Sequence, residues 1–306
     1  MGRRGAGPAR RSRTGRRRLA GAAAVGTAVA VLAVLAVLAP AAAAVGEHRS
    51  TNPTGPYYVA LGASESVGLQ PVPWEGRAVR TDQGYADVLR RMEQRRWPGL
   101  RLADFGCPGI TAQGALDGTG ACQYPNGSQI ATATSFVSAH PGAVAFVTVD
   151  LGFNDVAPCL AGEVVNQTCV DAALRHIASA VPVVVADLRA ASQGLLVVGL
   201  QHADPYVADA LFGKADFARR TVEVFDRMNA VLASAYDAAG AVVARVPSST
   251  GPASSPRAVE AACTSTWMCT DHNIHPTAAG YRAIADAVAE AIAAADPTAA
   301  DPTAAQ

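Results

Sequence analysis

Five short apolar runs alternate with segments of helical periodicity along residues 57–293, and this alternation limits the possible folds more than any other feature. The apolar runs lie at 57–61, 100–105, 143–151, 195–200 and 241–246. Between and after these runs, apolar side chains recur every three or four residues, which is typical of amphipathic helices. The last such segment has Tyr281, Ile284, Val288 and Ile292 at this spacing. Strands that alternate with helices predict a parallel sheet, and continuous apolar strands predict helices on both of its faces.

Helices are expected at 85–92, 128–139, 170–192, 224–235 and 281–292. Pro182 should break the third of these, because proline lacks the N–H that a helix interior needs. Residues 46–56 are expected to be a flexible lead-in. The tail at 296–306 repeats Asp-Pro-Thr-Ala-Ala and is expected to be disordered. One folded domain is therefore expected over 57–295.

The first 45 residues differ sharply from the rest. Residues 1–18 hold eight arginines and no acidic residue, an apolar run follows over 19–39, and Ala42, Ala43 and Ala44 come next. This order is typical of a secretory signal peptide, and the arginines at 16–18 also resemble a twin-arginine export signal. The apolar run of about 20 residues is equally long enough for a membrane anchor. With either outcome, the body is expected to be secreted or at the extracellular cell surface.

The charge of the body argues against nucleic acid as a partner. The whole chain has 25 Lys+Arg and 25 Asp+Glu, a net charge of zero. Without the eight leader arginines, 17 basic residues stand against 25 acidic ones, a net charge of −8. Binding to a phosphate backbone needs clustered basic residues instead.

The cysteines agree with an exported chain. An even number in such a chain favours disulfides. The six fall into three close couples, each of which would close a short loop: Cys107 with Cys122, Cys159 with Cys169, and Cys263 with Cys269. A zinc site is the rival interpretation, but no Cys-x-x-Cys pair occurs. We therefore expect no metal and no cofactor.

Polar residues that follow the expected strands are the candidates for a functional site. Ser64 follows the first strand, Gly109 the second and Asn154 the third, and His275 stands in the loop that leads into the last helix. Ligands bind beyond the carboxyl ends of parallel strands. A hydroxyl, a glycine N–H, a carboxamide and an imidazole are the parts of an acyl-transfer site. Each has a structural explanation alone, such as a helix N-cap for Ser64, so the prediction rests on the whole set.

These segments resemble the sequence blocks of the GDSL lipases, also called SGNH hydrolases, in their secreted actinobacterial form. Residues 60–64 with Gly68 resemble the first block, 104–109 the glycine block, and 275–281 the histidine block, while 152–155 match Gly-x-Asn-Asp outright. The resemblance spans about 57–293. It implies a three-layer α/β/α sandwich with a roughly five-stranded, flavodoxin-like parallel sheet, and a carboxylic ester hydrolase, esterase or lipase. No Gly-x-Ser-x-Gly occurs, which argues against an ordinary α/β-hydrolase.

The resemblance also implies a role for each of these residues. Ser64 would be the nucleophile and His275 the general base. The backbone N–H groups of Ser64 and Gly109, with the Asn154 side chain, would form the oxyanion hole.

The chain departs from the family pattern in two places. Ala63 stands where the first block usually has Asp. The family's acid usually lies three residues before the histidine, and this position is His272, whereas Asp271 lies four before. Either a one-residue bulge brings Asp271 to His275, which is the interpretation adopted here, or a backbone carbonyl orients the ring and leaves a Ser–His dyad.

Two other functions stay open at this point. One is a catalytically silent surface protein that binds lipid or glycan through the same cleft, and the other is an acyltransferase or polysaccharide deacetylase on the same scaffold. The expected partner is a small ester or lipid, and the chain is expected to be a monomer whose contact with membranes is limited to its N-terminal segment. His202 follows the fourth strand and is a candidate to line the cleft. Trp74, Phe212 and Phe217 could form an apolar lip there, but ordinary packing is the favoured interpretation for these three.

Overall fold

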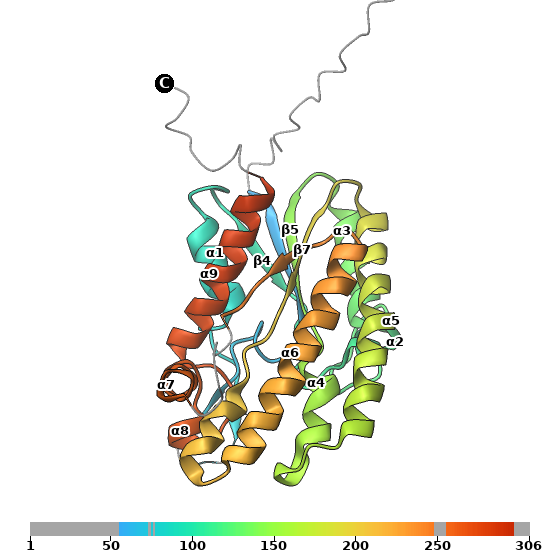
Figure 1. Ribbon diagram of the computed structural model, residues 1–306. Helices are drawn as coiled ribbons and strands as arrows, with labels where there is room; N and C mark the ends of the chain where they lie inside the picture. Colours follow the sequence, from blue (N-terminus) through green and yellow to red (C-terminus); the bar gives the residue numbers. More distant parts are fainter. Residues whose placement is uncertain (1–54, 73–74, 76, 248–254, 297–306) are drawn as a thin grey trace, which may run out of the picture. The chain divides into compact units, whose positions relative to one another are not determined.

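A five-stranded parallel sheet organises the chain in the computed structural model, which describes residues 55–72, 75, 77–247 and 255–296 (Figure 1). The strand order is β4-β1-β5-β6-β7. The strands are β1 (Tyr57–Gly62), β4 (Arg101–Asp104), β5 (Val144–Asp150), β6 (Leu196–Leu200) and β7 (Val242–Ala244). Because β1 is flanked by the second and third strands of the sheet, the winding direction reverses between β1 and β5. Ligand sites form beyond the carboxyl ends of the strands at such a point.

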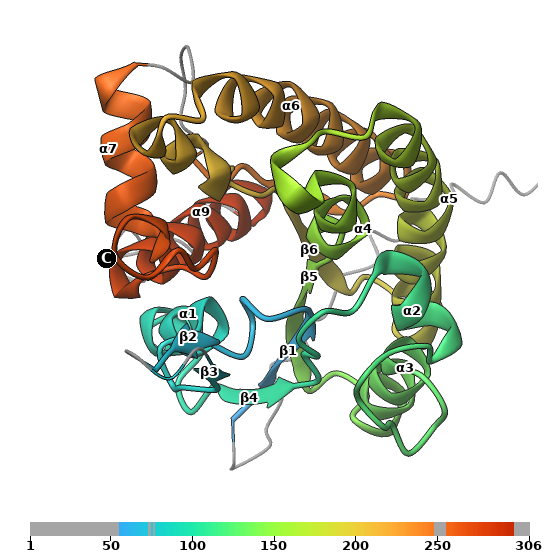
Figure 2. The ribbon, with the colours of Figure 1, turned by 90° about the horizontal axis from the view of Figure 1, so that it is seen from below.

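Both faces of the sheet are buried, as the continuous apolar runs predict. Successive strand residues point to opposite faces. Val59 and Leu61 of β1 belong to one apolar cluster, and Tyr58 and Ala60 belong to another. Figure 2 shows the two helical layers that cover these faces. The first cluster is covered by α2 (Ala112–Asp117), α3 (Gln129–Ala139), α5 (Gln167–Ala191) and α6 (Ala215–Ala238), and the second by α1 (Tyr85–Glu93) and α9 (Ala278–Ala295).

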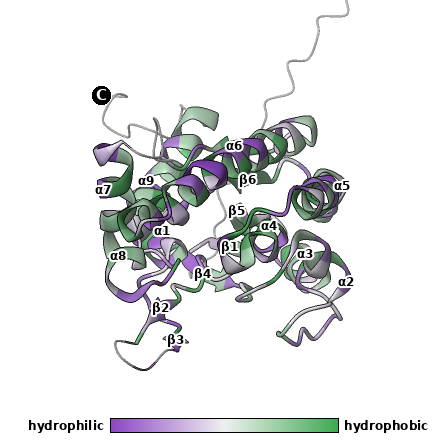
Figure 3. Cartoon of the chain, turned by 60° about the horizontal axis from the view of Figure 1, so that its bottom comes forward, coloured by the Kyte–Doolittle hydropathy of each residue, from purple (hydrophilic) through white to green (hydrophobic). Residues whose placement is uncertain are grey.

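The covering helices are amphipathic. Figure 3 colours α5 and α6 in both purple and green, as expected for helices with one apolar face. The expected break at Pro182 is wrong, because α5 continues through this residue to Ala191. The loss of one backbone hydrogen bond is tolerated here because Ile177, Val181, Val184 and Val185, on either side of the proline, are fully buried in the core.

Shorter elements complete the fold and were not expected from the sequence. They are the hairpin of β2 (Gln70–Pro71) and β3 (Ala78–Val79), the helices α4 (Phe153–Val156), α7 (Pro256–Ser265) and α8 (Met268–Asp271), and the 3₁₀ segments η1 (Ala157–Glu163) and η2 (Pro205–Phe212). Figure 1 shows α4, α7 and α8 at the lower end of the molecule.

The structure confirms the expected fold class, and the expected three-layer arrangement is present. It also confirms the three cysteine couples: disulfides join Cys107 to Cys122, Cys159 to Cys169 and Cys263 to Cys269. The expected leader at 1–45, most of the lead-in at 46–56 and the tail from 297 lie outside the described residues.

Candidate active site

The turn after β1 places Ser64 at the switch point of the sheet. Gly62 ends the strand with a φ of 133°, a conformation that favours glycine. A side chain at this position would also collide with the backbone of Asp150 on β5. The close approach continues at Ala63, whose N–H donates to the Asp150 carbonyl at 3.1 Å. Ser64 therefore leaves the sheet directly beside the end of β5.

Three of the residues expected in the site share one pocket. Ser64, Asn154 and His275 line it, together with Ala63, Glu65, Asp150, Phe153, Ile274 and Pro276. They come from the ends of β1 and β5 and from the loop before α9, which are far apart in sequence. Among the described contacts, no hydrogen bond joins Ser64 Oγ to the imidazole. Catalytic hydrogen bonds often tighten only once substrate is bound, so a shared pocket is the relevant observation.

The ring of His275 is held by Asn273. Its Nδ1 lies 2.7 Å from Asn273 Oδ1, and the same oxygen accepts a 3.0 Å hydrogen bond from the His275 backbone N–H. The second bond is an Asx turn, in which a side chain binds the N–H two residues on. Because a carbonyl oxygen can only accept, Nδ1 carries the hydrogen and Nε2 has the free lone pair.

Asp271, the expected acid, does not occupy this place. Its carboxylate accepts a 2.8 Å hydrogen bond from the hydroxyl of Thr270 instead. The chain turns immediately afterwards, because His272 adopts a left-handed conformation with a φ of 49°. The partner of the His275 ring is thus Asn273, a residue that the sequence analysis missed. The Asn two residues before the histidine is the signal that would have found it, since Asn favours Asx turns.

The surroundings of His275 favour a neutral ring. Burial lowers the pKa of His275 below its usual value, and the charge of Glu65 opposes this in part. An amide oxygen at Nδ1 offers no full negative charge to an imidazolium. A neutral ring can accept a proton from a hydroxyl group.

The expected oxyanion donors are fixed by contacts between α4 and the loop before α2. Asn154 Nδ2 donates to the Ile110 carbonyl at 3.0 Å, and the Asp155 carboxylate accepts from the Ala112 N–H at 2.9 Å. Burial raises the pKa of Asp155 to about 6, although the Ala112 N–H opposes this shift. Gly109 precedes the clamped segment with a φ of 81° and is exposed, but it is not among the residues lining the pocket. The Cys107–Cys122 disulfide holds the start of the same loop.

The family model of the GDSL-like lipase/acylhydrolase family matches residues 60–283, nearly three quarters of the chain. The chain belongs to this family. It is accordingly a carboxylic ester hydrolase, and the resemblance drawn from its sequence blocks is confirmed.

Several solved structures are similar to this GDSL-like hydrolase at low sequence identity. The lipase Lip_vut3 from a goat rumen metagenome is 16% identical with a TM-score of 0.50, covering 77% of this chain and 97% of its own. A catalytic mutant of Axe2, an acetylxylan esterase from Geobacillus stearothermophilus, is 12% identical with a TM-score of 0.50, covering 78% and 94%. An extracellular lipase from Streptomyces rimosus is 18% identical with a TM-score of 0.49, covering 77% and 99%. A search of curated proteins gave no match.

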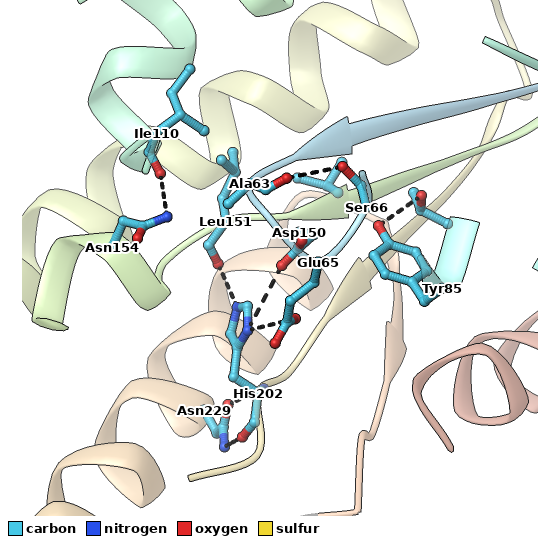
Figure 4. Close-up of polar contacts among 12 residues, drawn as sticks. Ala63, Glu65, Ser66, Tyr85, Ile110, Asp150, Leu151, Asn154, His202 and Asn229 are labelled. Atoms are coloured by element: carbon cyan, nitrogen blue, oxygen red, sulfur yellow. Dashed lines mark hydrogen bonds and ion pairs between the residues drawn. The ribbon is translucent and has the colours of Figure 1, made fainter. Parts of the chain in front are cut away.

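Two carboxylates and an imidazole of this GDSL-like hydrolase lie together beside the turn after β1, hereafter the nucleophile turn because the sequence analysis expects Ser64 in it to be the nucleophile (Figure 4). They are Glu65, Asp150 and His202, hereafter the buried triad. His202 Nδ1 is 3.5 Å from Glu65 Oε2 and 3.7 Å from Asp150 Oδ1. Burial alone would lower the pKa of His202, but Glu65 and Asp150 outweigh it and raise this pKa. His202 is thus not on the open cleft surface, as its position after a strand had suggested, but 1% exposed beneath it.

The three aromatic residues considered for the rim of the cleft have different surroundings. Phe212 is 38% exposed and its ring lies 4.7 Å from that of His272. Phe217 is buried and packs against Tyr206, so its role is in the core. Trp74 lies outside the described residues.

Proposed function

We propose that this chain is an exported serine esterase or lipase that cleaves carboxylic esters through an acyl-enzyme on Ser64. The observation that supports this most strongly is the shared pocket of Ser64, His275 and Asn154 at the carboxyl ends of β1 and β5. A nucleophile, a base and an amide donor are the minimum set for acyl transfer. Family membership supports the reaction class, and the shared pocket supports the choice of these residues.

In the first half-reaction, Ser64 Oγ attacks the ester carbonyl carbon while His275 Nε2 takes the hydroxyl proton. The hydrogen bond from Nδ1–H to Asn273 Oδ1 keeps the lone pair on Nε2. The carbonyl oxygen becomes an oxyanion that accepts hydrogen bonds from the backbone N–H groups of Ser64 and Gly109 and from Asn154. Asn154 has two amide hydrogens, and the Ile110 carbonyl uses one of them. The other is available to the oxyanion.

The oxyanion then collapses, the bond to the alcohol oxygen breaks, and His275 gives its proton to the leaving alcohol. Water repeats the sequence in the second half-reaction: His275 takes its proton as it attacks the acyl carbon, and Ser64 recovers its hydrogen as the acid leaves. No carboxylate touches the ring in this scheme. Asn273 acts as a positioning residue, because it contacts His275 and not the substrate.

A second pocket beside the first supports an apolar acyl group. It shares Glu65, Phe153, Ile274 and Pro276 with the catalytic pocket. Its other lining residues are mostly apolar: Ala203, Pro205, Val246, Pro247, Ser265, Thr266, Gly280, Ala283 and Ile284. An acyl chain that extends from the Ser64 carbonyl carbon into this pocket would be removed from water, and each CH₂ buried contributes about 0.8 kcal/mol. We expect kcat/KM to rise with acyl length until the pocket is filled.

Export is proposed from two features that agree. The leader has the charge and hydropathy order of a signal peptide, and three disulfides join all six cysteines. Disulfides persist in oxidising compartments and are rare in the cytosol.

A fluorophosphonate probe tests the mechanism, because it labels only an activated serine. The wild type should be labelled at Ser64 and should hydrolyse p-nitrophenyl esters. Ser64→Ala should lose both properties with its fold intact by circular dichroism. Ser138→Ala, which changes an exposed serine of α3, is the matched control and should retain both. Full ester hydrolysis by Ser64→Ala would refute the proposal, and an inert, unlabelled wild type would favour a silent binding protein.

A further inference from the structure

The buried triad has no part in the mechanism above, yet its three ligating atoms lie within 4.8 Å of one another. We propose that Glu65, Asp150 and His202 form a site for a divalent transition-metal ion, and that zinc is the ion it fits best. The site lies behind the nucleophile turn, and its side chains come from the ends of three adjacent strands, β1, β5 and β6. This inference is independent of the proposed hydrolytic mechanism.

The hydrogen bond on the far side of His202 sets the ring for metal binding. Its Nε2 lies 3.0 Å from the Leu151 carbonyl oxygen. Because a carbonyl only accepts, Nε2 carries the hydrogen. When an ion displaces the proton from Nδ1, the lone pair on Nδ1 points at the ion between the two carboxylates. Histidines that bind metals almost always donate their other N–H in this way, to a backbone carbonyl or carboxylate. Figure 4 shows this arrangement, with Leu151 on one side of the ring and the acidic residues on the other.

The backbone of His202 is equally fixed. Its N–H donates to Asn229 Oδ1 at 2.9 Å, and Asn229 Nδ2 donates to its carbonyl at 2.8 Å. The backbone of His202 is therefore held by α6, and its ring is held by the carbonyl group that directly follows β5. These contacts fix the position of Nδ1 relative to the carboxylates. A site built on such rigid elements needs little reorganisation to bind an ion.

The separations within the triad fit an ion better than a direct contact. Nδ1 lies 3.5 and 3.7 Å from the two carboxylate oxygens, beyond the usual 2.7–3.2 Å of a hydrogen bond. Ligands around a tetrahedral zinc, with bonds of 2.0–2.1 Å, are about 3.3–3.4 Å apart. Shifts of a few tenths of an ångström would bring Nδ1 to this distance from each carboxylate oxygen. The two carboxylate oxygens, which lie within 4.8 Å of each other, would close by at most about 1.5 Å.

Asp150 supplies the independent evidence for a ligand. Its side chain is 1% exposed, and neither of its carboxylate oxygens accepts a hydrogen bond of ordinary distance and angle from a residue that the structure describes. The backbone N–H groups of Ala63 and Ser66 lie near enough to oppose the rise of its pKa in part. His202 Nδ1 is likewise buried and makes no hydrogen bond of ordinary distance and angle, although both carboxylates lie within ion-pair range. Buried polar groups in proteins are almost always satisfied, because leaving them unpaired is costly. A bound cation would satisfy all three atoms at once.

The types of ligand favour zinc over calcium and magnesium, and the catalytic pocket connects the site to solvent. Calcium and magnesium prefer all-oxygen sites, whereas an imidazole with carboxylates suits zinc. Two carboxylates also balance the charge of a divalent ion. Glu65 and Asp150 line the catalytic pocket, and the Glu65 side chain is 20% exposed. The ion would enter from this pocket, and a water molecule from it would complete four-coordination.

Zinc titration of the purified full chain tests the proposal. After dialysis against a chelator, calorimetry should show one zinc per wild-type chain, and elemental analysis should show that it is retained after removal of free metal. Glu65→Gln and His202→Gln should each weaken zinc binding at least ten-fold. Glu75→Gln and His176→Gln, which change an exposed carboxylate and an exposed imidazole elsewhere, are the matched controls and should bind like wild type. Ser64→Ala should also bind like wild type.

Wild-type protein without stoichiometric zinc would overturn the proposal, and a proton on Nδ1 would then occupy the triad. Unchanged zinc binding in both triad variants would also overturn it, because the ion would then lie elsewhere, for example at His275. X-ray absorption of the zinc-loaded wild type needs no variant to fold. It should show one imidazole with oxygen ligands, and two imidazoles or any sulfur ligand would contradict the site.

Discussion

The amide of Asn273 at the His275 ring leads to a quantitative prediction. Asn273→Asp replaces the amide oxygen 2.7 Å from Nδ1 with a carboxylate oxygen of nearly the same size. The new group still accepts from Nδ1–H, so the ring keeps its tautomer. The change adds a full negative charge beside a ring whose pKa is lowered by burial.

The added charge stabilises the imidazolium that forms when Ser64 attacks. An opposite charge at this range raises a pKa by about 1–3 units, which corresponds to about 1.4–4 kcal/mol. If about half of this free energy stabilises the transition state, in which the proton is partly transferred, kcat/KM rises about 3- to 30-fold. The same charge moves the midpoint of the acidic limb of the pH profile to a pH about 1–3 units higher, because His275 must be neutral to act as a base.

The assay is kcat/KM for a short-chain p-nitrophenyl ester between pH 4 and pH 9. In the wild type, the midpoint of the acidic limb should lie below the usual histidine pKa of about 6.5. Asp271→Asn is the matched control, since its carboxylate contacts Thr270 and not the ring. It should leave both the limb and the rate unchanged.

The opposite pattern would refute this reasoning. If Asp271→Asn lowered the rate and the midpoint, while Asn273→Asp left both unchanged, the acid expected from the sequence would be the true partner of His275. The Asx turn would then have only a structural role.

Three further predictions follow from the site. Asn154→Ala should lower kcat by about 10²–10³ with little change in KM, as expected for loss of one oxyanion donor; an unchanged kcat would exclude Asn154 from this role. Replacing both Cys107 and Cys122 by Ser opens a loop with a sequence separation of 15 and should lower the unfolding free energy by about 3 kcal/mol in urea, whereas an unchanged midpoint would contradict it. Burial raises the pKa of Asp155 to about 6, above its unfolded value, so its contribution to stability is lost as pH rises from about 4 to 6. The unfolding free energy of Asp155→Asn relative to wild type should therefore increase by about 2 kcal/mol from pH 4 to pH 7, and a constant difference would refute it.

The sheet was predictable because its strands are continuous apolar runs. The run at 143–151 became β5 (Val144–Asp150), and the run at 195–200 became β6 (Leu196–Leu200). Long amphipathic helices such as α9 were placed equally well. The short α2 was missed, because its conformation depends on a distant residue: the N–H of its first residue, Ala112, is bound by Asp155 from beyond β5.

The site was predictable to the extent that it depends on strand ends. Ser64 and Asn154 follow β1 and β5, and His275 precedes a strong helix, so their shared pocket follows from parallel pairing. The partner of His275 was not predictable from spacing alone. It depends on the left-handed turn at His272, which directs Asn273 and not Asp271 to the ring.

The buried triad also explains the departure at Ala63. This residue is 4% exposed and belongs to the apolar cluster on one face of the sheet, directly beside Asp150. Burial and the charge of Glu65 already raise the pKa of Asp150. An aspartate at position 63 would add a third carboxylate to the same region, at a further cost in desolvation and like-charge repulsion. With Glu65 and Asp150 in place, a small apolar residue is the side chain that this position accommodates, and the nucleophile turn still presents Ser64 to the pocket.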